Sequence, residues 1–366
     1  MKKALTIRDI AEKAGVSLGT VSRVMNNAAN INPALRERTL AVMRQNNYIP
    51  LRRPRRNSRR NAVEGGRIAV LFFDISISWT ESYFSRSYAD GIREVCAAYR
   101  VEMEFFTLPD LCGERFYRQL QEFDGILIKH MFLPGDEQID RINALAEKVP
   151  VIGFGTGLPF CRYPQVFLDE RAAGSLAAKE LIARGHRVVA FINCDPENET
   201  FRSRGAGFRE TMQAHGLWIP ELFFERRIVT VRPRELDPVP PLLDRTLERI
   251  LAFSDKVTAT VVVNDWGCVG FYRACAARSI RIPEEMSVLG FDNQISICAS
   301  LNPPLSSISN PLFDIGKTAA WELLSRIDAG NRGINIPPCD RRFTGTIVKR
   351  ESILCIQSQP EGESMK

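Results

Sequence analysis

Several features that would mark an exported, membrane-bound or metal-binding protein are missing from this 366-residue sequence. No apolar run approaches the roughly 20 residues that span a membrane, and acidic and basic residues interrupt the N-terminus before a signal-peptide core could form. The nine cysteines include no C-x-x-C pair, and no neighbouring histidine completes a zinc set. The sequence therefore predicts a cytoplasmic protein with buried reduced thiols, no metal and no membrane partner.

Motifs for nucleotide or nucleophile chemistry are missing as well. No G-x-G-x-x-G follows a first strand, and neither G-x-x-x-x-G-K-[ST] nor G-x-S-x-G occurs. The three histidines, His130, His186 and His215, lie in unrelated contexts, and His186 is expected to form a hydrogen bond at a helix-to-strand turn. These absences predict a protein that is not an enzyme and needs no cofactor.

The modest net charge of +6 is distributed unevenly along the chain. Residues 1–67 contain 15 lysines and arginines against 4 acidic residues, whereas the remainder contains 34 basic and 39 acidic residues. A short basic segment joined to a mildly acidic body is expected when only that segment meets a polyanion.

The first fifty residues have the pattern of three short helices. Thr6 and Asp9 form a capping box, and Gly15 ends the first apolar stripe. Ser17 is expected to cap the second helix, and Asn32 the third, which has Pro33 in its first turn. Two short helices joined by a tight turn and followed by a third describe a helix-turn-helix head, although any small helical bundle would share this periodicity.

The head also resembles a known family. T-I-R-D-I-A at 6–11 and A-G-V-S-x-x-T-V-S-R-V-M-N at 14–26 closely resemble the DNA-binding head of the lactose-repressor (LacI-type) family. R-E-R at 36–38 and N-Y-I-P at 47–50 fall where that family has its third helix and its exit. The resemblance implies that the second helix enters the major groove of double-stranded DNA.

The resemblance assigns Leu18, Gly19 and Arg23 to positions that face bases. The Arg23 guanidinium can donate two hydrogen bonds to guanine O6 and N7, and Leu18 can meet a thymine methyl group. Leu18 could instead be a partly exposed residue without a base partner, and Gly19 would only permit close approach. Ser17, Thr20, Ser22 and Asn26 suit phosphate contacts, and Thr6 and Tyr48 complete the predicted DNA-binding residues of the head.

Residues 51–60 form an arginine-rich linker that departs from the family. Relatives usually have a hinge helix here, with an A-x-x-L core whose leucine enters the minor groove, but this pattern is absent and Pro54 disfavours a helix. Three interpretations remain: an arm ordered only by DNA, with arginines along the backbone or in a narrow minor groove; a flexible linker with phosphate contacts alone; or a displaced hinge helix at 57–63. The predicted DNA contacts of the linker are Arg52, Arg53, Arg55 and Arg56.

From Arg67 onward, apolar strands alternate with helices, which predicts an α/β body of doubly wound parallel sheets. The body resembles the family's core, which is similar to periplasmic sugar-binding proteins: two lobes, three chain crossings and a ligand in the cleft. The expected domains are the head at 1–50, the linker at 51–66, the body at 67–353 and a polar tail at 354–366. Strands are expected at 68–73, 101–106, 125–128, 149–154, 187–193, 260–263 and 287–291, and helices at 83–99, 174–183, 204–215 and 269–277.

The resemblance also implies an effector site in the cleft. Carboxylates, an amide and an arginine fork suit a polyol, because they exchange hydrogen bonds with hydroxyls. Trp79 and Trp266 could stack on a sugar face, although ordinary packing explains either tryptophan equally well. Asp292 could instead orient Arg204. The polar residues that correspond to effector contacts are Asp169, Arg204, Asn264, Asp265 and Asp292.

Together these features predict a sequence-specific transcription regulator whose operator affinity depends on a small molecule, a sugar or a sugar derivative (a carbohydrate effector). The sequence leaves open whether the regulator is a repressor or an activator. A homodimer on a pseudo-palindromic operator is expected. The tail has no heptads that would form a tetramer. The alternative is a solute-binding module without regulatory DNA binding.

Overall fold

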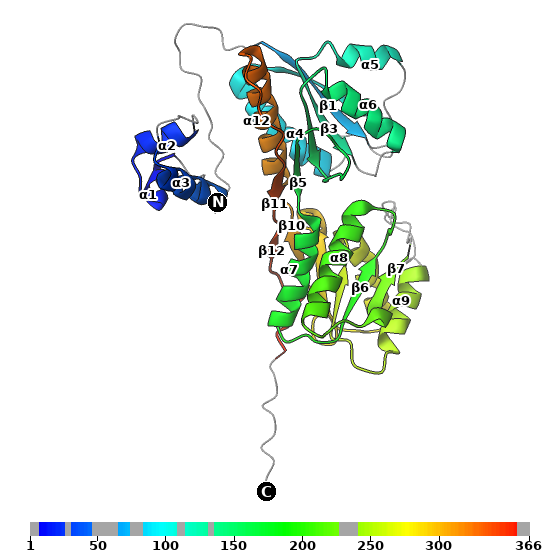
Figure 1. Ribbon diagram of the computed structural model, residues 1–366. Helices are drawn as coiled ribbons and strands as arrows, with labels where there is room; N and C mark the ends of the chain where they lie inside the picture. The colour runs from blue at the N-terminus through cyan, green and yellow to red at the C-terminus, as the bar shows by residue number, and fades with distance from the viewer. Residues whose placement is uncertain are drawn as a thin grey trace. The chain divides into compact units, whose positions relative to one another are not determined.

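The computed structural model describes residues 7–25, 31–45, 65–73, 83–107, 114–130, 135–226 and 241–356. The chain divides into two units, Met1–Asn61 and Ala62–Lys366. The first unit holds three helices, and the second consists of two α/β lobes (Figure 1). Within the described ranges, every helix is too short or too polar to span a bilayer.

Capping residues set the bounds of the helices in the head. Gly15, at φ 59°, follows the last residue of α1, and the backbone N–H of Thr20 donates to Ser17 Oγ over 3.1 Å at the start of α2. The N–H of Ala34 donates to Asn32 Oδ1 over 2.9 Å. These bonds confirm the predicted starts of the second and third helices. The helices are α1 (Ile7–Ala14), α2 (Leu18–Met25) and α3 (Pro33–Gln45).

A small apolar core holds the three helices together. Ile10 and Ala11 of α1 pack with Val21 of α2 and Met43 of α3. Arg38 Nη2 also donates to the carbonyl of Gly15 over 3.1 Å, which ties α3 to the turn between the first two helices. The remaining face of α2, which carries Leu18 and Arg23, is exposed.

Each lobe of the second unit contains a six-stranded sheet. The N-lobe has the strand order β11-β5-β4-β3-β1-β2, and the C-lobe has the order β12-β10-β9-β8-β6-β7. All neighbouring strands are parallel except β12, which runs antiparallel to β10 at one edge, and the predicted doubly wound parallel sheets are confirmed. The N-lobe strands are β1 (Arg67–Phe73), β2 (Glu102–Thr107), β3 (Gly125–His130), β4 (Val151–Gly155), β5 (Gln165–Leu168) and β11 (Arg341–Phe343).

The N-lobe strands are apolar on both faces because helices cover the sheet on both sides. In β1, Ile68, Val70 and Phe72 join the core beneath two helices, whereas Ala69 and Leu71 join the core beneath the other two. The first pair is α4 (Tyr83–Tyr99) and α12 (Leu312–Asn331), and the second is α5 (Glu114–Leu120) and α6 (Asp136–Ala146).

The C-lobe repeats this architecture around a single large core. Its strands are β6 (Val189–Asn193), β7 (Phe223–Glu225), β8 (Ala259–Val262), β9 (Ser287–Asp292), β10 (Ser306–Ser309) and β12 (Thr346–Val348). Its helices are α7 (Glu170–Ala183), α8 (Glu199–Ala214), the 3-10 turn η1 (Pro220–Leu222), α9 (Pro241–Leu251), α10 (Asp265–Ala277) and α11 (Ile295–Cys298).

The chain passes between the lobes three times, as predicted. The crossings run from β5 to α7, from β10 to α12 and from β11 to β12, as Figure 1 shows. In both sheets the first strand lies between the second and the third. In open α/β sheets, ligands bind at the carboxyl ends of the strands beside this change of direction.

Two glycines let α7 and α8 cross in backbone contact. A Cβ atom at Gly174 would lie 1.9 Å from the carbonyl oxygen of Arg204, and one at Gly207 would lie 1.8 Å from that of Arg171. No side chain fits at either position without moving a helix. This close crossing brings the side chains of the first turn of α7 to Arg204 on α8.

Replacing Gly207 with alanine should therefore destabilise the protein, although alanine favours a helix more than glycine by up to about 1 kcal/mol. We expect Gly207→Ala to lower the free energy of unfolding by about 1–3 kcal/mol, because overpacking forces the helices apart. Urea denaturation measures this change. Gly330→Ala is the matched control, since a Cβ there meets no atom within 4 Å. Equal stability of the two variants would contradict the proposed crossing.

Candidate functional site

The exposed face of α2 presents the residues predicted to read DNA. Val21 and Val24 are buried against the head, whereas Leu18 is 45% exposed and Arg23 is exposed. Arg23 Nε donates to the carbonyl of Gly19 over 3.3 Å, and Ser17 Oγ lies 2.9 Å from Thr20 Oγ1. The helix geometry thus places the candidate base contacts together on one face.

The other predicted DNA contacts are one further residue of α2 and several residues outside the described ranges. Ser22 lies in α2. Thr6, Asn26, Tyr48, Arg52, Arg53, Arg55 and Arg56 lie outside the described residues. The three interpretations of the linker therefore stay predictions.

A buried ionic cluster lies at the carboxyl ends of the C-lobe strands. Arg204 of α8 is only 2% exposed. Its Nε donates to Glu170 Oε2 over 2.7 Å, and its Nη2 lies 2.9 Å from Asp292 Oδ1. Nη1 donates to the carbonyl of Val263, directly after β8, over 2.8 Å. The guanidinium is thus fixed by α7, β8 and β9.

The charges of this cluster depend on each other. Burial raises the pKa of Glu170 and of Asp292, and the charge of Arg204 opposes the shift in both. Burial alone would lower the pKa of Arg204, but the two carboxylates outweigh it and raise that pKa. Arg204 therefore stays protonated, and removing any member leaves a buried charge without its partner.

Asp265 lies deeper, at the start of α10, and is fully buried. Its Oδ1 accepts from Ser307 Oγ over 2.7 Å, and its Oδ2 accepts from the backbone N–H of Gln294 over 2.7 Å and from the thiol of Cys298 over 3.2 Å. Burial, together with the charge of Asp292, raises the pKa of Asp265 to about 7. Both carboxylate oxygens thus bind groups of the C-lobe itself.

Two more predicted effector residues cap helices. The backbone N–H of Ala172 donates to Asp169 Oδ1 over 2.9 Å at the start of α7, and that of Gly267 donates to Asn264 Oδ1 over 2.7 Å at the start of α10. Trp266 follows in the first turn of α10 and is partly buried. Trp79 lies outside the described residues.

The N-lobe also holds buried polar residues that the sequence did not reveal. The hydroxyl of Tyr88 on α4 lies at the carboxyl end of β4, 3.2 Å from the position that a Cβ at Gly155 would take. Burial raises the pKa of Tyr88, and the charges of Glu170 and Asp292 add to this shift. Lys129, at the end of β3, is 8% exposed, and its Nζ lies 5.8 Å from the centroid of the Tyr88 ring. Glu170 was also missed; its place directly after the capping Asp169 was the one available signal.

The raised pKa of Asp265 predicts a pH-dependent stability. At pH values between 3.8, the ordinary pKa of an aspartate, and about 7, Asp265 is protonated more often in the folded protein than in the unfolded chain. The contribution of Asp265 to stability is therefore full at low pH and is lost as the pH rises through about 7. In Asp265→Asn, the free energy of unfolding should fall less between pH 4.5 and pH 7.5 than in the wild type. Asparagine cannot accept all three hydrogen bonds, so the variant should be less stable than the wild type at every pH. The test is therefore how steeply the free energy of unfolding changes with pH, and parallel profiles for the two proteins would contradict the prediction.

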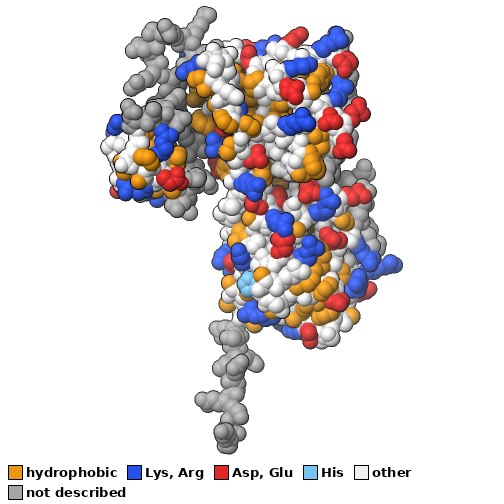
Figure 2. All heavy atoms as spheres, in the orientation of Figure 1, with side chains coloured by type: hydrophobic (Ala, Val, Ile, Leu, Met, Phe, Trp, Pro, Cys, Tyr) orange, Lys and Arg blue, Asp and Glu red, His pale blue; other side chains and the backbone are white. Residues whose placement is uncertain are grey.

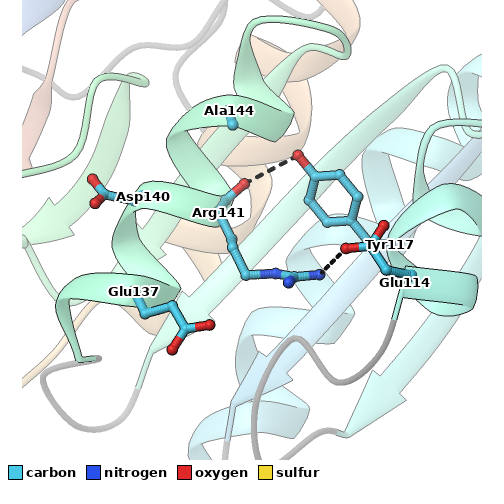
Figure 3. Close-up of a pocket in the computed structure, with 6 residues that line it drawn as sticks. All are labelled: Glu114, Tyr117, Glu137, Asp140, Arg141 and Ala144. Carbon is cyan, nitrogen blue, oxygen red and sulfur yellow. Dashed lines mark hydrogen bonds and ion pairs between the residues drawn. The ribbon is translucent and has the colours of Figure 1, made fainter.

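A hollow lies on the N-lobe surface between α5 and α6 (Figure 3). Arg141 Nη2 donates to Glu114 Oε1 over 3.3 Å, and the Tyr117 hydroxyl donates to the carbonyl of Arg141 over 3.4 Å. The Arg141 guanidinium also lies 5.0 Å from the centroid of the Tyr117 ring. These contacts join α5 to α6, so they have a structural explanation without a ligand.

A smaller hollow lies in the C-lobe, where its lining includes Phe253, Val257 and Met286. Acidic and basic side chains are interspersed over the face of the second unit that Figure 2 shows. Among the described residues, no set of three His, Cys, Asp or Glu side chains is arranged to hold a metal ion. The Arg204 cluster combines buried charges with a place at the carboxyl ends of the strands, where open α/β sheets bind ligands, so it is the main candidate for ligand recognition.

Comparisons with known proteins match both units. Residues 6–51 match the family described as bacterial regulatory proteins, lacI family, and residues 178–353 match the periplasmic binding protein-like domain. The HTH-type transcriptional regulator DegA of Bacillus subtilis is 30% identical over 324 residues, which cover 85% of this chain and 88% of DegA.

Solved structures share the fold. A lac repressor dimer bound to operator and the anti-inducer ONPF superimposes with a TM-score of 0.62 at 21% identity, covering 96% of this chain and 100% of that one. The complex of the transcriptional regulator CelR with cellobiose gives a TM-score of 0.61 at 22% identity, covering 95% and 99%. At these identities the likeness concerns the fold.

Proposed function

Because this chain belongs to the lacI family of bacterial regulatory proteins, we propose that it binds a sugar between its lobes and that the sugar sets its affinity for operator DNA. The observation that carries the proposal is the buried Arg204–Glu170–Asp292 cluster at the carboxyl ends of the C-lobe strands. Burying such charges is costly, and apolar residues of similar volume often give equal or greater stability. Binding of a polar ligand would explain why charged side chains occupy this buried position.

The proposed division of roles follows the geometry. Arg204 and Asp292 contact the effector, and Asp169 and Asn264 fix the helix starts beside it. Asp265 supports the turn after β9 through the N–H of Gln294. Trp266 and Trp79 are the proposed stacking residues. Of these roles, that of Asp265 is a positioning role, because both of its oxygens are engaged within the C-lobe.

The head is the proposed reader of the operator. Leu18, Gly19 and Arg23 face base edges, and Ser17 and Thr20 lie where phosphates would pass. A lac repressor of the same fold binds its operator as a dimer, and we extend this arrangement to the present chain. Two heads related by a twofold axis then require a pseudo-palindromic site with half-sites about one helical turn apart.

Two other functions have less support. A solute-binding module without regulatory DNA binding leaves unexplained why residues 6–51 match the head of a regulatory family. Catalysis lacks support in the relatives, which are transcription regulators. Recovery of a bound sugar in a chemically altered form would overturn the sensor proposal in favour of an enzyme.

A thermal-shift screen tests the proposed sensor directly. An effector at about 100 times its dissociation constant should add about 2.7 kcal/mol to the stability of the folded state. We expect at least one sugar to raise the melting temperature of the wild type and to lose this effect in Asp292→Asn. A screen of sugars without any shift would contradict the proposed effector class and leave the DNA-binding function in place.

The linker gives a separate prediction about DNA affinity. If Arg52, Arg53, Arg55 and Arg56 each meet a phosphate, replacing all four with glutamine should reduce the slope of log affinity against log salt by about 3–4. Fluorescence anisotropy at several salt concentrations measures the slope. An unchanged slope would show that these arginines do not contact DNA.

A further inference from the structure

The buried arginine of the proposed effector site has few donors left for a ligand. Of its five N–H groups, the Nε and both N–H groups of Nη2 face Glu170 and Asp292, and one N–H of Nη1 donates to Val263. The guanidinium carbon also lies 4.8 Å from the centroid of the Phe291 ring. An anionic ligand would have to displace Glu170 or Asp292 before it could pair with Arg204.

Unpartnered polar atoms near Asp292 suit hydroxyl groups. Asp292 Oδ1 accepts from Asn310 Nδ2 over 3.3 Å. Asn310 Oδ1 is buried without a partner among the described residues, and so is Nε2 of Gln294, a side chain that is 6% exposed. A hydroxyl both donates and accepts, whereas an ionised carboxylate only accepts.

Carboxylates also outnumber cations around the cluster. Glu170 and Asp292 face Arg204, and the charges of Asp292 and Asp169 act on Glu170. Asp265 lies close enough to feel Asp292. The cations include Arg204, Arg350, whose Nη2 donates to Asn293 Oδ1 over 2.7 Å, and Lys129 beside Tyr88. Placing another negative charge here would set it against like charges in a poorly solvated site.

We infer that Glu170 restricts the effector to uncharged sugars, because it holds Arg204 against the C-lobe and so excludes sugar acids and sugar phosphates. This inference rests on the proposed function and narrows it to one ligand class. Glu170 is a positioning residue that acts through Arg204. A change in the role of Glu170 is therefore measured as a change in the ratio of the affinities for uncharged and anionic ligands. Partial unfolding of a variant would lower both affinities and leave this ratio unchanged.

The test uses the full-length protein and three pairs of probes: glucose with glucuronate, galactose with galacturonate, and ribose with ribose 5-phosphate. Isothermal titration calorimetry gives both affinities within a pair. For any pair that binds, we expect the uncharged sugar to bind at least about tenfold more tightly, as like-charge juxtaposition is costly. Glu170→Gln should narrow this ratio several-fold. Glu210→Gln is the matched control, since Glu210 is an exposed carboxylate on α8 that pairs with Arg171.

Each outcome has a distinct meaning. Tighter binding of a uronate or a sugar phosphate by the wild type would overturn the inference and leave the sensor function standing. An affinity ratio that Glu170→Gln leaves unchanged would overturn the role of Glu170. If no probe binds while operator DNA still binds, the sugar effector is itself wrong, and the inference falls with it.

Discussion

Replacing Arg204 with methionine should lower the free energy of unfolding by about 3–5 kcal/mol, because it leaves two buried carboxylates without their cation. Glu170 and Asp292 both pair with Arg204 and are both buried. Without Arg204, burial would raise their pKa values further. The loss of stability should therefore be greater at pH 8 than at pH 5, since protonation at lower pH neutralises the carboxylates. Chemical denaturation at both pH values measures the effect.

A matched variant at an exposed ion pair shows how much stability is lost when a pair is broken without leaving a buried charge. Arg171 on α7 pairs with Glu210 at the surface, where both side chains are well exposed. Arg171→Met should cost at most about 1 kcal/mol. A triple variant, Arg204→Met with Glu170→Gln and Asp292→Asn, should recover part of the lost stability. A cost below about 1 kcal/mol for Arg204→Met alone would contradict the account of the cluster.

Replacing Arg23 with alanine should weaken operator binding by about 1–3 kcal/mol for each half-site, which corresponds to about 5- to 150-fold. Arg23 is exposed on α2, where its Nε donates to the carbonyl of Gly19 over 3.3 Å. DNA binding would redirect its fork to a guanine. Anisotropy titrations with the operator and with a scrambled duplex measure the change.

Arg23→Lys distinguishes base reading from charge. Lysine keeps the positive charge but lacks the planar fork that forms two parallel hydrogen bonds. We expect Arg23→Lys to retain its affinity for the scrambled duplex and to lose discrimination at one base pair of each half-site. Equal losses on operator and scrambled DNA would show that Arg23 contacts phosphates instead.

Alternating apolar strands and helices were sufficient to predict the two lobes, yet several element bounds required structural context. The helix expected at 174–183 begins at Glu170, and the one expected at 204–215 begins at Glu199. In both cases a polar first turn, capped by Asp169 or Asn198, precedes the apolar stripe. Apolar periodicity does not detect such a turn.

Other elements depend on partners far away in the sequence. The helix α12 was not predicted; its buried residues surround much of the helix, which lies against both α4 and the sheet. A Cβ at Gly316 would lie 2.2 Å from the carbonyl oxygen of Tyr88, so this contact needs both helices in place. The three-residue strands β11 and β12 form only by pairing with β5 and β10.

The candidate site was only partly predictable, because some of its residues are brought together by contacts between distant parts of the sequence. The resemblance identified Arg204 and Asp292, and the structure brings them within 2.9 Å of each other. This contact supports the alternative that Asp292 orients Arg204. Direct contact between Asp292 and the effector stays a proposal. The contribution of Glu170 depends on the α7–α8 crossing, and its place directly after Asp169 was the one local signal for it. No local pattern indicates Tyr88.

The most direct test of a sugar-controlled regulator is to measure the linkage between its two ligands. Operator affinity is determined with and without a saturating sugar found in the thermal-shift screen, and sugar affinity is determined with and without operator. We expect both affinities to change by the same factor, about 5- to 150-fold, because coupling between two sites is reciprocal. A sugar that binds between the lobes and leaves operator affinity unchanged would contradict the account.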